Sequence, residues 1–362
     1  MRFSQYHSDW TRCSLSDIAN VVGGGTPDTA DETLWNGDIQ WFTPTEVGHS
    51  KYVSKSIRTI SQSGLKKSSA KILPKGSVLL SSRATVGECS IAQIDCTTNQ
   101  GFQSLIPKTN VNNEFLYYLA QTKKRHFIKY ASGSTFLEIS NSEIKKTKCF
   151  VPRIEEQTKI AEFLSLIDRK LEVQNKIISK YETLIKGLCD KIFRRNKTVS
   201  LSDLIICKTS TLQENEVVND NSGQYNVFGA SGIIASISNY QFDRNAILVL
   251  KDGSKAGKIQ YASGKYSVVG TSVILMPKIE SDAKYLYFAM LAIDFGQYKV
   301  GSGIPHIYFK DYSSEKIYYP DETQRNRIEK ALTSYETKLG VEKRMLSALL
   351  KQKAFLLQSM FI

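Results

Sequence analysis

Apolar residues recur every three or four positions over two long stretches of this chain. The first stretch covers residues 154–194, and its seam is interrupted by one polar residue, Gln174. The seam residues are Ile160, Leu164, Ile167, Leu171, Gln174, Ile178, Tyr181, Ile185, Leu188 and Ile192. This is the a/d heptad pattern of a coiled coil. It predicts one amphipathic helix of about 40 residues and about 60 Å, far longer than most helices of globular domains.

The same pattern returns at the C-terminal end of the sequence. Its seam residues are Ile328, Leu332, Tyr335, Leu339, Glu342, Leu346, Leu349, Lys353, Leu356 and Met360. Each stretch follows a proline, Pro152 or Pro320, and begins with acidic residues that suit the positive end of a helix dipole. A strict repeat of this length favours pairing of the two helices over one buried helix in each domain.

An antiparallel pairing matches every seam residue of one helix with a seam residue of the other. In this register the two polar residues near the middle, Gln174 and Glu342, fall in adjacent layers. A diagonal hydrogen bond between them would fix the register of the helices at some cost in stability. We also expect the ammonium group of Lys353 to reach Asp168 while its aliphatic stem packs in the seam.

The globular segments that precede the two helices also repeat one another. Residues 15–18 and 201–204 carry the same Leu-Ser-Asp-aliphatic tetrad, and a turn at Gly87 matches one at Gly257. Short apolar runs bounded by turn residues predict strands at 38–44, 77–80, 89–94, 104–106, 246–250, 259–261 and 273–276. The stretch 61–73, rich in lysine and serine, is expected to form a loop.

We therefore predict an α+β protein with an internal pseudo-two-fold repeat. The expected segments are a first globular domain (residues 1–152), a first helix (153–195), a second globular domain (196–320) and a second helix (321–362). The two helices are expected to form a long antiparallel coiled coil between the two mixed α/β domains.

Composition limits the class of function. Among 362 residues, 48 Lys and Arg exceed 35 Asp and Glu, giving a net charge of +13. This surplus indicates an acidic polymer as partner, nucleic acid before an anionic membrane. No apolar run is long enough to span a membrane and residues 1–10 are polar, so we expect a cytoplasmic protein. The 6 cysteines form no Cys-x-x-Cys pair and the 4 histidines are dispersed, which predicts reduced thiols and no metal site.

The catalytic signals in the sequence are weak. Residues 253–258 resemble a phosphate-binding loop, but three residues rather than four separate the glycines and no hydroxyl residue follows Lys258. Asp321 with Glu336 and Lys338 imitates a nuclease pattern, yet Glu336 and Lys338 point to different faces of the predicted helix. The chain has no Pro-Pro pair and no glycine fingerprint for S-adenosylmethionine. We expect no catalytic residue and no cofactor in this chain.

The candidate binding residues lie in the predicted loops of both globular segments. Arg83, Thr85, Asn99 and Gln100 carry groups that suit base edges in a DNA major groove, and the lysines suit phosphates. The full set of expected DNA-binding residues is Thr45, Lys66, Lys67, Ser82, Arg83, Thr85, Asn99, Gln100, Lys251, Asp252, Ser254, Lys255, Lys258, Lys265 and His306.

Several of these motifs resemble the DNA-specificity subunit of type I restriction-modification systems. In the first half the similar segments are residues 24–27, 37–44, 64–71, 80–87 and 98–102, and in the second half they are 225–234 and 251–254. Pro152, Gln157 and Asp168 resemble the start of the conserved helical region of the family. The second copy departs from it, because Gln324 lies four residues after its proline rather than five, and Glu336 stands in place of Asp168.

The resemblance implies two target-recognition domains that each read one half of a split double-stranded DNA target, with the helices setting the spacer. It further implies that two methyltransferase (M) subunits, carrying S-adenosylmethionine, dock on the helices, and that restriction (R) subunits join the full complex. No membrane is involved, and this chain would be non-catalytic. Two alternatives remain open: a self-sufficient DNA methyltransferase or nuclease, or the specificity module of another DNA-modifying phage-defence complex.

Overall fold

The chain folds into two compact units, seen in a computed structural model that describes residues 2–133, 137–195, 197–217, 223–301 and 303–361. Unit 1 consists of Met1–Val173 with Leu346–Ile362, and unit 2 of Gln174–Met345. Each unit therefore holds one globular domain together with a segment of both long helices. The class is mixed α and β, as predicted.

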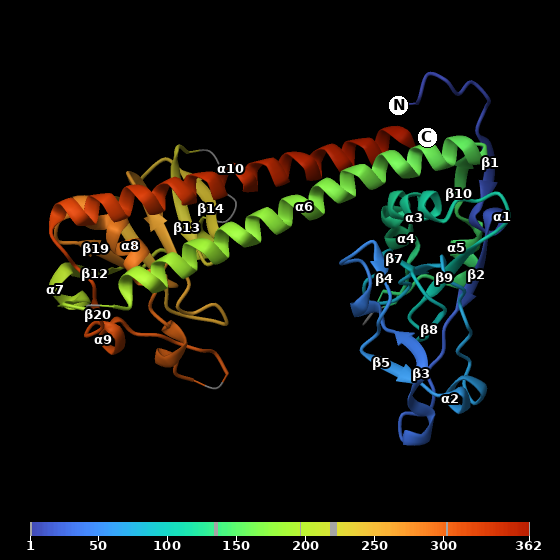
Figure 1. Cartoon of the computed structure of the whole chain (residues 1–362), viewed down its shortest axis with the longest axis horizontal. Helices are drawn as coiled ribbons and strands as arrows, with labels where there is room; N and C mark the ends of the chain where they lie inside the picture. The colour runs from blue at the N-terminus through green and yellow to red at the C-terminus, as the bar shows by residue number, and fades with distance from the viewer. Residues whose placement is uncertain (1, 134–136, 196, 218–222, 302, 362) are drawn as a thin grey trace. The chain divides into compact units, whose positions relative to one another are not determined.

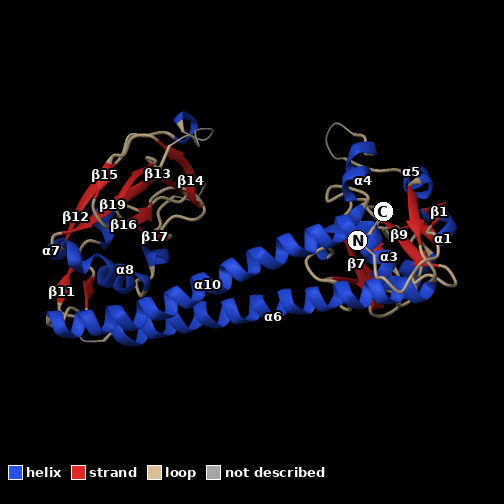
Figure 2. Ribbon diagram, turned by 90° about the horizontal axis from the view of Figure 1, so that it is seen from above, coloured by secondary structure: helices blue, strands red, loops and turns tan. Residues whose placement is uncertain are grey.

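The two predicted long helices are confirmed as α6 (Ile154–Phe193) and α10 (Glu322–Met360). Every seam residue predicted for either helix is buried or half-buried, and none is exposed. In unit 1, Leu164 and Leu356 belong to one apolar core, and in unit 2, Ile185 and Leu332 belong to another. Both helices contribute to the core of each unit, and Figure 1 and Figure 2 show them running side by side. Burial of these stripes, rather than helix propensity, is what stabilises helices of this length.

Polar contacts confirm the antiparallel direction and the predicted register of α6 and α10. The Nε2 of Gln174 donates to the backbone oxygen of Glu342 at 3.0 Å and also to the Glu342 carboxylate. In unit 1, the Nζ of Lys353 lies 2.7 Å from Oδ1 of Asp168. Both contacts were expected from the heptad positions. A polar group in an apolar seam is satisfied in one alignment only, so the Gln174 to Glu342 contact disfavours a shifted register.

The strands of unit 1 form three small sheets. A five-stranded sheet has the order β2-β9-β6-β7-β4, a three-stranded sheet has the order β5-β3-β8, and β1 pairs with β10. The strands are β1 (Thr11–Ser14), β2 (Ala19–Gly23), β3 (Trp35–Phe42), β4 (Tyr52–Val53), β5 (Arg58–Ile60), β6 (Val78–Leu80), β7 (Cys89–Ala92), β8 (Cys96–Thr98), β9 (Gln103–Pro107) and β10 (Lys148–Val151). The helices are α1 (Leu15–Ile18), α2 (Gln62–Lys66), α3 (Asn113–Thr122), α4 (Lys124–Tyr130) and α5 (Asn141–Lys146), with 3-10 turns η1 (Glu32–Leu34) and η2 (Pro44–Glu46).

Unit 2 repeats this plan. Its sheets have the orders β12-β19-β16-β17 and β14-β13-β18-β15, and β11 pairs with β20. The strands are β11 (Val199–Ser200), β12 (Ile205–Thr209), β13 (Tyr225–Gly229), β14 (Gly232–Ile237), β15 (Phe242–Asp243), β16 (Ala246–Leu250), β17 (Ile259–Ala262), β18 (Lys265–Val268), β19 (Ser272–Pro277) and β20 (Lys316–Ile317). The helices are α7 (Leu201–Leu204), α8 (Ala283–Leu291) and α9 (Phe309–Tyr312), with 3-10 turns η3 (Glu214–Glu216), η4 (Glu280–Asp282) and η5 (Phe295–Tyr298).

The main antiparallel sheets correspond strand by strand, since β2, β9, β6 and β7 match β12, β19, β16 and β17. In addition, the parallel pair β3 and β8 matches the parallel pair β13 and β18. The predicted internal repeat is therefore present in the topology of the sheets as well as in the helices. One expectation is wrong: the stretch 61–73 is not all loop, because residues 62–66 form α2 and the side chain of Ser61 caps it by accepting a bond from the Gly64 amide.

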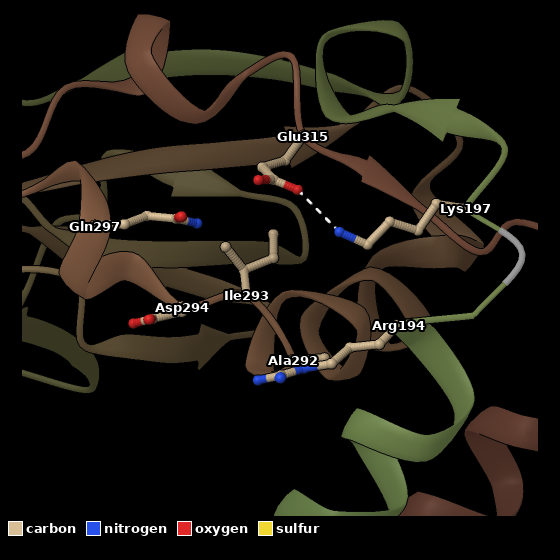
Figure 3. Close-up of a pocket in the computed structure, with 7 residues that line it drawn as sticks. All are labelled: Arg194, Lys197, Ala292, Ile293, Asp294, Gln297 and Glu315. Carbon is tan, nitrogen blue, oxygen red and sulfur yellow. Dashed lines mark hydrogen bonds and ion pairs between the residues drawn. The ribbon is translucent and has the colours of Figure 1, made fainter.

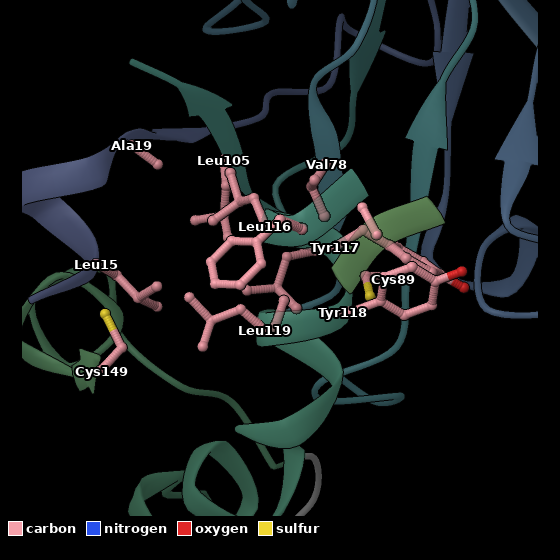
Figure 4. Close-up of a cluster of buried hydrophobic side chains, with 14 of the residues drawn as sticks. Leu15, Ala19, Val78, Cys89, Leu105, Leu116, Tyr117, Tyr118, Leu119 and Cys149 are labelled. Atoms are coloured by element: carbon pink, nitrogen blue, oxygen red, sulfur yellow. The ribbon is translucent and has the colours of Figure 1, made fainter. Parts of the chain in front are cut away.

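The core of unit 1 lies between α3, the five-stranded sheet and the long helices. Leu116 and Leu119 of α3 pack in the same cluster as Val78 and Leu105 of the sheet, all of them buried (Figure 4). Burying such a side chain contributes about 1.5 to 3 kcal/mol. Because α6 joins this cluster through Leu164, the globular domain and the helices of unit 1 share one core.

A half-buried polar network also connects the globular domain of unit 1 to α6. The Nζ of Lys51 bonds Oε2 of Glu114 at 2.8 Å and Oγ of Ser165, and the hydroxyl of Tyr118 donates to Oδ2 of Asp168 at 2.6 Å. Burial acts to raise the pKa of the Glu114 carboxyl. Hydrogen bonds from Lys51, Tyr52 and Ser165 outweigh burial, so the pKa lies below its ordinary value. Glu114 is thus held as a carboxylate at this joint.

The start of each long helix is tied to its domain by one residue at the same heptad position. In unit 1, Gln157 donates to the Pro152 carbonyl at 2.9 Å and accepts from the Asn112 amide at the start of α3. In unit 2, Arg325 donates to the Pro320 carbonyl at 2.7 Å and to Asp282, which precedes α8, at 3.0 Å. Arg325, and not Gln324, is therefore the structural equivalent of Gln157. This explains why the distance from the proline to the glutamine differs between the two copies.

Candidate nucleic-acid interface

Two equivalent loops follow equivalent central strands in the two units. The β6–β7 loop covers residues 81–88, and the β16–β17 loop covers residues 251–258. Gly87 and Gly257 both have a φ of 86°, in the left-handed region that favours glycine. A Cβ on Gly87 would lie 2.7 Å from Lys124, and one on Gly257 would lie 2.6 Å from Phe295. At both of these predicted turns, the backbone angle and the lack of space for a Cβ therefore require glycine.

A second segment clamps each loop with the same backbone hydrogen bonds. In unit 1, Ala84 N donates to Leu137 O at 3.2 Å and Ile139 N donates to Ser82 O at 2.9 Å. In unit 2, Gly253 N donates to Pro305 O at 3.0 Å and Ile307 N donates to Lys251 O at 2.9 Å.

A third segment bonds the start of each loop, through Ser82 N to Gly101 O and through Lys251 N to Thr271 O. This bonding pattern makes Arg83 the structural counterpart of Asp252, and Glu138 the counterpart of His306. In both units these counterparts form an isolated antiparallel bridge.

The β6–β7 loop brings together several residues predicted from the sequence. Arg83 is exposed, and its Nε lies 3.7 Å from Oε2 of Glu138. Thr85 is exposed beside the turn η2, whose Thr45 is also exposed, and the Thr85 hydroxyl contacts the Pro44 carbonyl at 3.4 Å. A shallow hollow of about 230 Å³ lies between these segments, lined by Pro44, Thr45, Val47, Gly48, His49, Thr85 and Glu88.

The segment that follows β8 lies next to this loop. Gln100 is exposed and accepts a hydrogen bond from Thr26, whereas Asn99 is half-buried and its Oδ1 accepts from the Gly101 amide at 2.9 Å. The side-chain oxygen of Asn99 is thus used to shape the loop. Ser82 is a correction to the predicted set, because its side chain is fully buried and cannot contact a ligand in this structure. Ser81 is buried as well, and the exposed part of the loop begins at Arg83.

The predicted lysines of unit 1 lie elsewhere. Lys66 ends α2 and Lys67 caps it, and both are exposed. Helix α2 packs against η1, β3 and β5, so these two lysines belong to a different part of unit 1 from the β6–β7 loop. They remain candidates for a contact with the DNA backbone rather than for base reading.

The β16–β17 loop gathers most of the predicted residues of unit 2. Ser254, Lys255 and Lys258 are exposed and Lys251 is half-buried. The Nδ1 of His306 lies 2.8 Å from Oδ1 of Asp252. Lys265 stands apart on β18, with its ammonium 4.7 Å from the centre of the Tyr240 ring. The structure therefore unites five predicted residues, Lys251, Asp252, Ser254, Lys255 and Lys258, in one loop and adds His306 from the clamping segment.

Sequence reasoning missed Arg58, the first residue of β5. Its guanidinium carbon lies 3.5 Å from the centre of the Trp35 ring, and the arginine is exposed. Trp35 and Trp41 contact one another edge to face at 5.0 Å, and Trp41 is fixed by a hydrogen bond to the Gly25 carbonyl. An arginine stacked on an aromatic ring is pre-organised for planar hydrogen bonding. The strand pairing that brings Arg58 beside Trp41 gives no local sequence signal.

The described residues hold no group of three or more His, Cys, Asp and Glu that could bind a metal ion. A polar hollow of about 320 Å³ in unit 2 is lined by Arg194, Lys197, Ala292, Ile293, Asp294, Gln297 and Glu315 (Figure 3). Its charges have protein partners: Lys197 lies 3.2 Å from Glu315, and Arg194 lies 3.1 Å from Asp190. Among the described helices, none is long and apolar enough to cross a membrane.

Comparisons with known proteins agree with this architecture. A family model for the type I restriction modification DNA specificity domain matches residues 7–183 and again residues 194–351. The MjaIX specificity subunit of Methanocaldococcus jannaschii is 41% identical over 179 residues, which is 48% of this chain and 41% of that relative. The EcoprrI specificity subunit of Escherichia coli is 23% identical over 353 residues, 89% of this chain and 86% of that relative.

A solved structure of a type I S subunit from M. genitalium shares the fold. It covers 100% of this chain and 99% of its own, with a TM-score of 0.63 at 17% identity. The match to the M. jannaschii subunit, by contrast, spans less than half of that relative's length. The double match of the family model falls on the same repeat that the sheets and helices display.

Proposed function

Since this chain belongs to the family of type I restriction-modification DNA-specificity subunits, we propose that it is the non-catalytic subunit that directs a DNA-modifying complex to its target. The observation that carries this proposal is the duplicated loop scaffold. The β6–β7 and β16–β17 loops share their backbone bonds but present different side chains. Two copies of one scaffold with different exposed groups suit a target made of two different halves.

Each unit supplies base-reading and phosphate-binding groups. In unit 1 the base readers are Arg83, Thr85, Gln100 and the stacked Arg58, while Lys66 and Lys67 bind phosphates. In unit 2, Lys251, Ser254, Lys255, Lys258 and Lys265 supply phosphate and polar contacts around Asp252 and His306. The net charge of +13 supports electrostatic attraction to double-stranded DNA.

The partners of the helices are two M subunits, which carry S-adenosylmethionine and perform methylation, and R subunits in the full complex. Apolar side chains outside the seam support docking on this surface. Leu166 and Val173 of α6 and Val341, Met345 and Phe355 of α10 are all exposed, Phe355 to 59%. Apolar groups in such number on one pair of helices indicate a protein interface. The domain boundaries near residues 152, 195 and 320 and a cytoplasmic location form part of the same proposal.

The test is methylation mapping in a host that expresses this chain with its M subunits. We expect a two-part motif with adenine methylation that depends on this chain. Arg83→Ala should weaken recognition of one half, by about 1 to 3 kcal/mol for a base contact, and Lys255→Ala should weaken the contact to the other. Arg12→Ala and Lys316→Ala, which change exposed residues outside the loops, are the matched controls.

Two results would end the proposal. One is methylation or cleavage of DNA by the pure chain at ordinary enzyme rates. The other is an effect of Arg83→Ala and Lys255→Ala on the same half of the motif, because the two residues lie in separate units.

A further inference from the structure

His306 is held rigidly beside the β16–β17 loop. Its backbone amide donates to Val300 O at 2.8 Å, and its carbonyl accepts from Val300 N at 2.9 Å. The neighbouring bonds of Pro305 and Ile307 attach the same segment to the loop. The side chain is fixed in turn by Asp252, whose Oδ1 lies 2.8 Å from Nδ1. Backbone and side chain together leave the imidazole little freedom.

The partner of Nδ1 decides which ring nitrogen carries the proton. An ionised carboxylate can only accept a hydrogen bond, so Nδ1 must donate. In the neutral imidazole the other nitrogen, Nε2, is then an acceptor. No hydrogen bond joins Nε2 to any residue that the structure describes, and the side chain is 41% exposed. In its neutral form, His306 therefore presents Nε2 as an acceptor on the surface of unit 2.

We propose that Nε2 of His306 accepts a hydrogen bond from the exocyclic amino group of one adenine or cytosine in the half of the DNA target read by unit 2. These amino groups, adenine N6 and cytosine N4, are the base-edge donors in the major groove. Guanine and thymine present oxygen acceptors there. Either base would place an acceptor against Nε2, without a hydrogen atom to form a bond. This inference rests on the proposed function and adds a named residue, a named atom and a class of base.

The counterpart bridge in unit 1 carries different side chains. Arg83 stands where Asp252 stands, and Glu138 stands where His306 stands. A guanidinium can only donate hydrogen bonds, and it suits the N7 and O6 acceptors of guanine. The same backbone bridge therefore presents a guanidinium donor at Arg83 in unit 1, where unit 2 has the carboxylate of Asp252 that orients His306. A ligand with one uniform chemistry, such as the phosphate backbone, would not require this exchange.

The first test uses the wild-type chain in complex with its M subunits and duplexes that carry the mapped motif. Each adenine or cytosine of the second half-site is replaced singly by an analogue without the amino group, purine or 2-pyrimidinone. We expect one position at which the loss weakens binding about tenfold in the wild-type complex. The same replacement should have no effect in His306→Ala, and whether the sensitive base is adenine or cytosine identifies the donor. An analogue in the spacer controls for weakened base pairing.

The second test changes the group that fixes the proton. Asp252→Asn leaves an amide that can either donate or accept, so the complex should now tolerate guanine or thymine at the sensitive position. Asp311→Asn removes an equal charge from an exposed residue of the same unit, and Glu138→Gln changes the counterpart bridge in unit 1. Neither control should alter preference at that position.

The outcomes separate this inference from the proposed function. If the complex recognises a two-part motif but no amino group of the second half-site is sensitive to His306→Ala, the inference is overturned and the function stands. If the complex shows no two-part specificity, the proposed function fails first. A sensitive amino group located in the half-site that Arg83→Ala disturbs would also overturn the assignment of His306 to the second half.

Discussion

Replacing Arg325 should destabilise unit 2 more than any other single change at the start of a long helix. Arg325 is only 9% exposed, and its Nε donates to Oδ1 of Asp282 at 3.0 Å. Asp282 is 4% exposed and otherwise accepts only from the hydroxyl of Tyr319 among the described side chains. Arg325→Ala would leave this carboxylate buried without its cation and would also free the Pro320 carbonyl.

Removing one partner of a buried ion pair costs about 3 to 5 kcal/mol, because the remaining charge stays desolvated. Domains of this size are stable by about 5 to 15 kcal/mol in total, so the loss is a large fraction of the stability of unit 2. Urea denaturation of the chain, followed by near-UV circular dichroism, should show an early transition that the wild-type chain lacks.

The equivalent joint of unit 1 suggests a double variant that should recover the stability lost in Arg325→Ala. At the equivalent joint Gln157, a neutral residue, bonds the Pro152 carbonyl and the Asn112 amide. Arg325→Gln combined with Asp282→Asn copies that neutral arrangement and should recover at least half of the stability that Arg325→Ala loses. A loss below about 1 kcal/mol in Arg325→Ala, or a double variant no better than Arg325→Gln alone, would refute the reasoning from a buried charge.

Three further predictions concern the helices and their joint. Gln174→Leu combined with Glu342→Leu should raise the free energy of unfolding by about 1 to 4 kcal/mol, since apolar side chains replace a polar contact in the seam; an unchanged or lower midpoint in urea would contradict this. Duplicating residues 175–181 of α6 and 339–345 of α10 keeps every seam pair and adds about 10 Å of helix, so methylation mapping should find a spacer about three base pairs longer; an unchanged spacer would contradict the spacer role. The lowered pKa of Glu114 contributes stability that is present above the ordinary value of 4.5 and is lost as the pH falls through the folded-state pKa, so Glu114→Gln should flatten the acid-side decline in stability, measured by urea titration from pH 6 to pH 3.

The helices and their register could be predicted because the information is local and repeats. A seam residue every three or four positions fixes the face of a helix, and two polar residues then fix the alignment. The contact between Gln174 and Glu342 follows from counting alone. The strand at β16 and the turn at Gly257 were also predictable, since an apolar run and a glycine with positive φ each have a sequence signature.

What the sequence could not show depends on residues that meet only in the folded chain. Asp252 and His306 are 54 positions apart, and no periodicity links them. Ser82 belongs to the same predicted loop as Arg83, but its side chain is fully buried, and only the fold shows where the exposed part of the loop begins. Helix α2 was missed because it has one large apolar side chain, Leu65, among polar residues and a glycine, which is too little to show a helical period.

The pattern of what the two halves share supports their separate roles in recognition. Where a residue positions backbone, the bond is kept even when the residue changes: Gln157 and Arg325 both hold a proline carbonyl, and Gly87 and Gly257 both allow the same turn. Where a side chain faces outward from that backbone, its chemistry is exchanged, as between Arg83 and Asp252. Selection for stability alone explains the first kind of agreement but gives no reason for the second. An exchange of donor for acceptor at one fixed bridge is instead what two different base sequences would demand of a single duplicated scaffold.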